Sequence, residues 1–326
     1  MKKVLILGGT QFIGRSVVER LLELHQYDIT LFNRQRTQAD LFSGCHKIKG
    51  DRYTDDILQL TNQYWDFVID VSCYYPAKLD EFIDQMEGRI GRYIFISTVS
   101  VYQLDEASQD HLITENNTAI LDCTEAQKTD TTVSSYGERK AECERVLLKY
   151  TWLDKIILRP CIVYGKHDHT DRFYYWLWKI RQQQRFVIPK CEHEKITLTY
   201  ISDLVNIVVR SMDIKEHSIF YNTSTHEPYS LKEILLKMDA NMQAIEIEVP
   251  ILLEKGITPG MSAPLWFNLS LKVSNEKLKQ DFNIEFIPFE QSIEETKVYY
   301  QQLQWPKPKA GFDPAIEQEL LQDSIN

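Results

Sequence analysis

The sequence predicts an α/β protein with a Rossmann-type, doubly wound parallel sheet and a smaller C-terminal α/β region. Short apolar runs alternate with amphipathic helical segments up to about residue 160, and glycines directly follow the first run. Strands are expected at residues 4–7, 29–32, 47–49, 67–71, 93–97 and 155–158. Helices are expected at 12–25, 55–63, 78–86 and 135–150, where apolar residues recur at helical spacing.

The pattern changes in two later parts of the chain. After Pro160 the elements become more mixed, with a helix expected at 173–180, a strand at 198–200 and a helix at 203–211. Between residues 103 and 134 no periodicity is found, and one basic residue, Lys128, accompanies acidic residues at 105, 106, 110, 115, 122, 125 and 130. A polar connection of this length is usually functional, so we expect a loop over a site; a solvated insertion is the alternative.

The composition excludes several classes of protein. The 326 residues are 43% hydrophobic and 26% charged, enough for one or two buried cores. A net charge of −10 repels nucleic-acid phosphates, and no stretch approaches the about 20 apolar residues of a membrane span. The six cysteines form no CxxC pair, which indicates reduced thiols. We therefore expect a cytoplasmic protein with no nucleic-acid or membrane partner.

A glycine-rich turn after the first strand predicts a dinucleotide site. The turn Gly8-Gly9-Thr10-Gln11-Phe12-Ile13-Gly14 follows a strand and opens a helix, as a dinucleotide fingerprint requires. Its first glycine would make the tight turn, and its last would let the helix approach the sheet. Free N–H groups at the helix start would bind a pyrophosphate. The expected cofactor-binding residues here are Gly8, Thr10, Gln11, Phe12, Ile13 and Gly14; an ordinary tight turn is the alternative.

The end of the second strand bears on the choice of cofactor. A carboxylate there would bind the ribose 2′-hydroxyl of NAD(H), whereas a cation would suit the 2′-phosphate of NADP(H). The sequence is Asn33-Arg34-Gln35-Arg36, with two arginines and no acid. Guanidinium groups match phosphate in a planar, bidentate way. We therefore favour NADP(H), bound near Asn33 and Arg34, and keep NAD(H) as the alternative if both arginines are solvated.

Tyr136 and Lys140 begin a predicted helix at a spacing of four residues, which places them on one face. A nearby ammonium lowers the pKa of a phenol toward the range in which it can act as an acid or base. Hydroxyl groups that could hold a carbonyl or alcohol oxygen follow the fifth strand, at Ser97, Thr98 and Ser100. Ligands bind at this edge of a doubly wound sheet.

Together these motifs resemble the extended short-chain dehydrogenase/reductase family, the NAD-dependent epimerase/dehydratase group, over nearly the whole chain. The resemblance implies that Thr98 orients the reacting oxygen and that Tyr136 is the acid/base. It also implies that Lys140 binds the nicotinamide ribose and lowers the pKa of Tyr136. Other positions that match the family around the cofactor are Asp51, which would contact adenine, Arg52, Val71, Ser72 and Pro160.

Within this family the sequence most resembles an isoflavone-reductase-like branch of reductases. The similarity lies in the glycine turn, the Asn33-Arg34 pair, the Asp168-x-Thr170-Asp171-Arg172-Phe173 segment and Pro264-Leu265-Trp266. Asp171 and Arg172 are expected to gate the substrate, although Thr170-Asp171 also suits a helix N-cap with an acidic first turn. The expected substrate residues are Tyr74, Thr98, Tyr136, Cys161, Asp171 and Arg172.

Departures from the family pattern narrow the implied chemistry. Val99-Ser100 stands where sugar-nucleotide dehydratases have an Asp-Glu pair, which disfavours 4,6-dehydration. Ile162 and Ile196 stand where many relatives have Asn and Arg, which weakens a nucleotide-sugar substrate. Gln11 replaces the middle glycine of the turn and narrows the approach to the pyrophosphate. No metal is expected, because loop histidines such as His167 are more often hydrogen-bond partners than ligands.

We expect an NAD(P)-binding domain at residues 1–165 and a mainly substrate-binding domain at 166–326, with some elements returning to the Rossmann core. The expected function is NAD(P)-dependent hydride transfer at a C–OH/C=O centre of a small molecule. Helices 78–87 and 135–150 would pair two copies into a homodimer. One alternative is an NAD-dependent nucleotide-sugar epimerase. The other is a non-enzymatic RNA-binding or scaffold protein, because a chloroplast stem-loop RNA-binding group shares the GGTxFIG opening and the Asn33-Arg34 pair.

Overall fold

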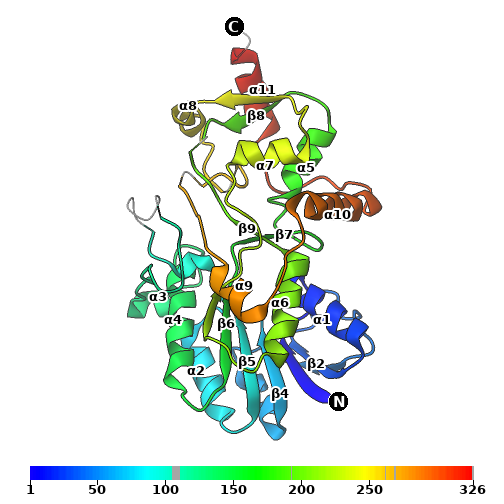
Figure 1. Ribbon diagram of the computed structural model, residues 1–326, viewed down its shortest axis with the longest axis vertical. Helices are drawn as coiled ribbons and strands as arrows, with labels where there is room; N and C mark the ends of the chain where they lie inside the picture. Colours follow the sequence, from blue (N-terminus) through cyan, green and yellow to red (C-terminus); the bar gives the residue numbers. More distant parts are fainter. Residues whose placement is uncertain (105–110, 192, 261, 268, 325–326) are drawn as a thin grey trace.

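The computed structural model describes residues 1–104, 111–191, 193–260, 262–267 and 269–324 (Figure 1). Its main feature is a seven-stranded parallel sheet with the strand order β10-β6-β5-β4-β1-β2-β3. The strands are β1 Lys2–Leu7, β2 Tyr27–Asn33, β3 His46–Lys49, β4 Trp65–Asp70, β5 Ile90–Ile96, β6 Lys155–Arg159 and β10 Phe220–Asn222. The predicted Rossmann-type fold is therefore confirmed.

Helices cover both faces of this sheet because its strands are apolar on both sides. In β1, Val4 and Ile6 pack in one cluster with α1 (Phe12–Leu24) and α6 (Ile201–Asp213). The alternate residues, Leu5 and Leu7, pack in a second cluster with α2 (Pro76–Gln85) and α4 (Tyr136–Lys149). Figure 1 shows these two helix pairs on opposite sides of the sheet.

The segment expected to form an α-helix at 55–63 is instead a 3-10 helix, η1, over Asp55–Asn62. Its start is tightened by side chains that bond back to the backbone. Thr54 accepts a hydrogen bond from Asp56 N, and the Asp56 carboxylate accepts one from Asp51 N at 3.0 Å. Such local bonds compete with the α-helical pattern.

A second region lies beyond the carboxyl ends of the strands (Figure 1). Two small parallel pairs form it, β7 (Ile162–Tyr164) with β9 (Leu198–Tyr200) and β8 (Phe186–Pro189) with β11 (Ala244–Ile247). Its helices are α5 Tyr174–Arg181, α7 Leu231–Met238, α8 Val249–Glu254, α10 Phe289–Gln302 and α11 Pro314–Asp323. The remaining short elements are η2 Val99–Val101, α3 Glu125–Lys128 and α9 Glu276–Phe282. The domain boundary after residue 165 stays a prediction.

None of the helices in the described ranges is long and apolar enough to cross a membrane.

Asp203, at the start of α6, predicts a pH-dependent stability. Its carboxylate is 1% exposed, accepts a hydrogen bond from Ile287 N at 3.2 Å, and has one oxygen without a partner among the described residues. Burial, with a contribution from the charge of Glu295, raises the pKa of Asp203 to about 7. Between pH 4 and 7 the folded protein therefore holds a proton that the unfolded chain has released, so stability falls as the pH rises.

We expect the free energy of unfolding, measured in urea, to be about 3 kcal/mol lower at pH 8 than at pH 4.5 through this group, at ~1.4 kcal/mol per pKa unit. Asp203→Asn should remove most of that slope. Asp213→Asn, at the exposed end of the same helix, is the control and should keep it. An unchanged slope in Asp203→Asn would show that this carboxyl is ionised in the folded protein.

Candidate functional site

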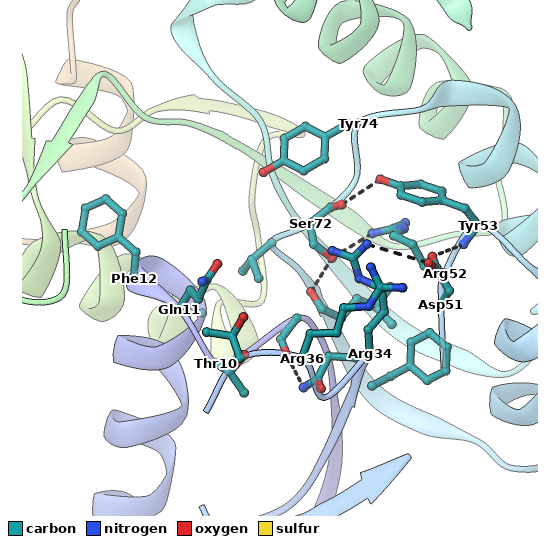
Figure 2. A pocket seen from close by; sticks show the side chains of 18 of the residues that line it. Thr10, Gln11, Phe12, Arg34, Arg36, Asp51, Arg52, Tyr53, Ser72 and Tyr74 are labelled. Atoms are coloured by element: carbon teal, nitrogen blue, oxygen red, sulfur yellow. Dashed lines mark hydrogen bonds and ion pairs between the residues drawn. The ribbon is translucent and has the colours of Figure 1, made fainter. Parts of the chain in front are cut away.

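A cavity of about 640 Å³ lies at the carboxyl ends of β1, β2 and β4. This volume is in the range of small-molecule and cofactor sites. Figure 2 shows Thr10, Gln11 and Phe12 on one side of it, with Arg34, Asp51 and Arg52 on the other. The lining residues that the sequence predicts at a cofactor are Gly8, Thr10, Gln11, Phe12, Ile13, Gly14, Asn33, Arg34, Asp51, Arg52, Val71 and Ser72.

The glycine turn is packed so closely against its neighbours that side chains at Gly8 or Gly14 would collide with them. Gly8 has a φ of +116°, and a Cβ placed on it would lie 2.7 Å from Val71 Cγ2. A Cβ on Gly14 would lie 2.8 Å from Gly9 N, so α1 can approach the turn only with glycine there. Gln11 is extended, with φ −135°, and the next residue, Phe12, has a φ of +35°. The turn thus keeps the close helix approach that a pyrophosphate site needs, with a strained residue after Gln11.

At the end of β2, Asn33 supports the turn and Arg34 borders the cavity. The Asn33 amide donates to Gly8 O at 3.0 Å, and its oxygen accepts from Gln35 N. Arg34 is about half exposed, and its Nη1 lies 3.9 Å from an Asp51 carboxylate oxygen. Arg36 also lines the cavity (Figure 2). The cation-rich strand end predicted from the sequence is therefore at the cavity wall.

A buried ion pair that the sequence analysis did not predict lies under the cavity floor. The Arg52 guanidinium donates to both oxygens of Asp70, at 2.6 and 2.9 Å, and Asp70 is fully buried. Asp70 also accepts from Tyr93 OH and from Ser72 N. Despite burial, the charge of Arg52 keeps the pKa of Asp70 below its usual value. Arg52, which was expected to contact the cofactor, thus forms its ion pair with Asp70.

The charged residue at the end of the apolar β4 run was the available signal for this pair. Ser72, two residues later, joins the pair to the glycine strand, because its hydroxyl donates to Leu7 O at 2.9 Å and accepts from Arg52 Nη1 at 3.3 Å. Tyr53 OH donates to Ser72 O, which Figure 2 shows as a dashed line. The strand end that carries Val71 and Ser72 is consequently held in one position.

Tyr136 is the first residue of α4 and lines the cavity. Its ring lies 6.1 Å from that of Tyr74, centroid to centroid. Burial raises the pKa of Tyr136, while a hydrogen bond with Thr98 and the positive charge of Arg172 lower it. The Thr98 hydroxyl also accepts from Ser100 N at 3.1 Å, which fixes it at the start of η2. The predicted tyrosine and its hydroxyl partner are therefore together.

Lys140 differs from the expected arrangement. Its ammonium donates to Ile96 O at 2.6 Å and Cys73 O at 3.1 Å, lies 4.0 Å from the centre of the Phe95 ring, and is not at the cavity surface. Burial outweighs the nearby charges at Tyr136 and raises its pKa, and Lys140 is not one of the main influences on it, so the lowering of this pKa by Lys140 stays a prediction. The two carbonyls place Lys140 beneath the ends of β4 and β5.

Besides Lys140, the predicted residues that do not line the cavity are Thr98, Pro160, Cys161, Asp171 and Arg172. Pro160 accepts from Val99 N at 3.0 Å, and the Cys161 thiol lies 3.2 Å from Thr197 Oγ1. Asp171 accepts from Lys309 N at 2.9 Å, which ties the segment before α5 to the one before α11. Arg172 lies near Tyr136, since each affects the other's pKa. Asp171 bonds to a backbone N–H outside the cavity, whereas the charge of Arg172 acts on Tyr136.

Residues 131–133 also line the cavity, so the end of the acidic connection is at the site as predicted. Its acidic residues 105, 106 and 110 lie outside the described residues. Arg139, which the sequence analysis did not select, lines the cavity and donates to Thr132 O at 2.6 Å. Its place one turn after Tyr136 was the only signal. In the described ranges, no group of three or more His, Cys, Asp or Glu could hold a metal ion.

Comparison with known proteins gives one family. The model of the NAD dependent epimerase/dehydratase family matches residues 4–223. A curated relative is the chloroplast stem-loop binding protein of 41 kDa b from Arabidopsis thaliana, which is 22% identical over 218 residues. That alignment covers 62% of this chain, and the chain spans about half (53%) of the relative's length.

Solved structures share the fold over nearly the whole chain. UDP-glucuronic acid 4-epimerase from Bacillus cereus, in complex with NAD, superimposes with a TM-score of 0.69 at 18% identity, covering 93% of this chain and 100% of that one. dTDP-glucose 4,6-dehydratase from Bacillus anthracis, also with NAD, has a TM-score of 0.71 at 15% identity, covering 93% and 97%. UDP-glucose 4-epimerase from Thermotoga maritima gives 0.70 at 14% identity, covering 93% and 99%.

Proposed function

Because the chain belongs to the NAD dependent epimerase/dehydratase family, we propose that it transfers hydride between a nicotinamide cofactor and a C–OH/C=O centre of a small molecule. The observation that carries this proposal is the placement of Tyr136 at the wall of the cavity that the glycine turn borders, with Thr98 close enough to lower the pKa of its phenol. A phenol and a hydroxyl that bind the same oxygen can exchange a proton with it.

The residues present fit a dinucleotide. Gly8 and Gly14 let the turn, Val71 and the start of α1 pack closely because no Cβ is there, which is the arrangement that a pyrophosphate site needs. Arg34 and Asp51 would hold the adenosine half, and Ser72 the strand end below it. When bound, the nicotinamide would accept or supply the hydride. Cytoplasmic location and a homodimer through α2 and α4 stay predictions from the sequence.

The pKa of Tyr136 favours the reductive direction. Burial raises this pKa, so the phenol is protonated at neutral pH and can donate its proton to a carbonyl oxygen that Thr98 holds. Arg172 partly offsets the cost of the phenolate that results. Lys140 would position the ends of β4 and β5 through its bonds to Cys73 O and Ile96 O. Oxidation of an alcohol would instead require a deprotonated Tyr136 and a higher pH.

The first experiment is a titration of the purified protein with NADPH and with NADH, followed by nicotinamide fluorescence, after a check for cofactor that co-purifies. Exchangeable binding supports the dehydrogenase/reductase proposal. Tightly held NAD in the purified protein would favour the nucleotide-sugar epimerase instead. Binding of neither would show that Gln11 and Phe12 close the pyrophosphate site.

The cofactor preference gives a prediction at Arg34. We propose that Arg34 and Arg36 favour NADP(H), because they border the cavity and no acid follows β2. Arg34→Glu should weaken NADPH binding by about tenfold to a hundredfold, the value of a charged hydrogen bond, and change NADH binding little. Arg20→Glu, on the exposed side of α1, is the control. Equal effects on both cofactors would contradict the preference.

RNA binding is a second candidate, favoured by the similarity to the chloroplast stem-loop binding protein. The net charge of −10 disfavours it. A stem-loop RNA titrated at several salt concentrations separates the two proposals. Affinity that falls steeply with salt and does not change in Tyr136→Phe would favour the RNA-binding function.

A further inference from the structure

The guanidinium group of Arg172 makes few hydrogen bonds with the described residues of the protein. Arg172 lies two residues before α5, in the segment that connects β7 to α5 within the second region. The side chain is partly buried, and within the described ranges only its Nε has a hydrogen-bond partner, Thr170 Oγ1 at 3.2 Å. None of the carboxylates in the described part of the chain forms an ion pair with it.

The fully buried arginines of the described residues are different. Arg52 makes a bidentate pair with Asp70, and Arg159 makes one with Glu144, at 3.0 and 2.5 Å. Arg139 donates to the backbone oxygens of Thr132 and Ser135. A guanidinium removed from water without such partners is costly. Among the arginines of this part of the protein that are removed from water, Arg172 therefore has no ion-pair partner, and the charge of Asp168 acts on it only from beyond ion-pair distance.

The surroundings of Arg172 hold it in a defined orientation. Thr170 donates its hydroxyl hydrogen to Asp168 Oδ1 at 2.7 Å, which leaves a lone pair for Arg172 Nε. Asp168 is 5% exposed. His167 and Asp171 both have positive φ, +65° and +57°, in a conformation that only a well-determined segment maintains for residues other than glycine. These contacts thus hold the Arg172 guanidinium in position while leaving it only partly buried.

Arg172 also lies within electrostatic reach of Tyr136. Burial lowers the pKa of Arg172, and the charges of Asp168 and, to a smaller extent, Tyr136 raise it. The positive charge of Arg172 in turn lowers the pKa of Tyr136. His169, three residues before Arg172, lines the same cavity as Tyr136, and its ring lies 6.0 Å from that of Phe12, so this segment borders the site. A group bound by Arg172 would consequently lie at this side of the cavity.

We propose that Arg172 binds an anionic group of the substrate, a carboxylate or a phosphate, next to the C–OH/C=O centre at Tyr136. This inference rests on the proposed function in one respect, that Tyr136 marks the reacting centre. The free Nη atoms suit an anion with two oxygens in a plane, which supplies the bidentate partner that Asp70 and Glu144 supply elsewhere. The substrate class is then an oxidised or reduced organic acid or phosphate ester.

Calorimetric titration of the full chain, saturated with NADH so that the pyrophosphate site is occupied, tests this inference. The probes are malonate for carboxylate, inorganic phosphate for phosphate, and malonamide as the neutral match of malonate. We expect malonate or phosphate to bind at least about tenfold more tightly than malonamide, the value of a charge-assisted hydrogen bond. Whichever anion binds better identifies the kind of group.

Three variants make the test specific. Arg172→Gln should lose about tenfold or more in anion affinity, and Arg172→Lys should lose less because it keeps the charge. Arg181→Gln, on the exposed part of α5, should bind the anion like the wild type. Normal NADH affinity in Arg172→Gln shows that the variant is folded.

Two results would overturn the inference: no anion binding to the wild type at concentrations where malonamide also fails to bind, or equal anion binding by wild type and Arg172→Gln. Failure of the proposed function is distinguishable. If NADH does not bind, the same titrations on the protein alone still measure the contribution of Arg172.

Discussion

Tyr136→Phe is expected to reduce turnover by about 10²- to 10⁴-fold, the usual contribution of a general acid or base. The substitution removes one hydroxyl group and keeps the ring that packs near Tyr74. Affinity for NADPH or NADH should change less than about twofold, because the glycine turn, Arg34 and Asp51 are untouched. Steady-state rates and cofactor titration of the same preparation measure the two quantities.

Tyr75→Phe is the matched control, since Tyr75 also lines the cavity but packs edge-to-face against Tyr53, with 4.7 Å between the ring centroids. The pH profile adds a second readout. A raised pKa predicts that carbonyl reduction is nearly constant around neutral pH, whereas alcohol oxidation accelerates as the pH rises toward that pKa. Full activity of Tyr136→Phe on a genuine substrate would refute this mechanism.

Asp70→Asn is expected to destabilise the protein by about 3–5 kcal/mol, because it leaves the Arg52 guanidinium buried without its counter-charge. Arg52 is 7% exposed and Asp70 is fully buried, so solvent cannot replace the lost partner. The free energy of unfolding in urea at neutral pH measures the effect. The midpoint of denaturation should fall while the slope of the transition stays constant.

Glu81→Gln is the control for Asp70→Asn. It breaks an exposed ion pair with Lys78 on α2 and should cost less than about 1 kcal/mol. The double substitution Arg52→Met with Asp70→Leu should recover much of the loss, because apolar residues of similar size can replace a buried pair. A small effect of Asp70→Asn would show that Arg52 reaches water or another partner.

The fold could be predicted from the sequence because each strand and helix of the sheet region has a local signal. Val4, Leu5, Ile6 and Leu7 form a run that is apolar on both faces, which is typical of a parallel strand covered by helices. By contrast, β10 has only three residues and follows α6 by a short connection. Its place beside β6 depends on pairing over more than sixty residues, which no local pattern contains.

The site was predictable from the sequence where a short motif follows directly on a predicted strand or begins a predicted helix. The glycine turn and Tyr136 meet at one cavity, with Thr98 near Tyr136, because the carboxyl ends of parallel strands share an edge. The pair of Arg52 and Asp70 was not predictable, since a distance of eighteen residues says nothing about a contact between two strand ends. The contacts of Lys140 were not predictable either. Its helical spacing from Tyr136 does not indicate which carbonyl groups its ammonium would bond.

The position of β10 has a consequence for how this chain is made. Until residues 220–222 have been synthesised, β6 is the last strand on its side of the sheet, and its N–H and C=O groups are unpaired. An open, apolar strand edge of this kind is a template for pairing with other chains. During synthesis the edge of β6 therefore stays open to pairing with other chains while about sixty further residues are added. This takes some seconds at ordinary rates of translation. Binding of chaperones to this strand edge should end once β10 has left the ribosome and paired with β6.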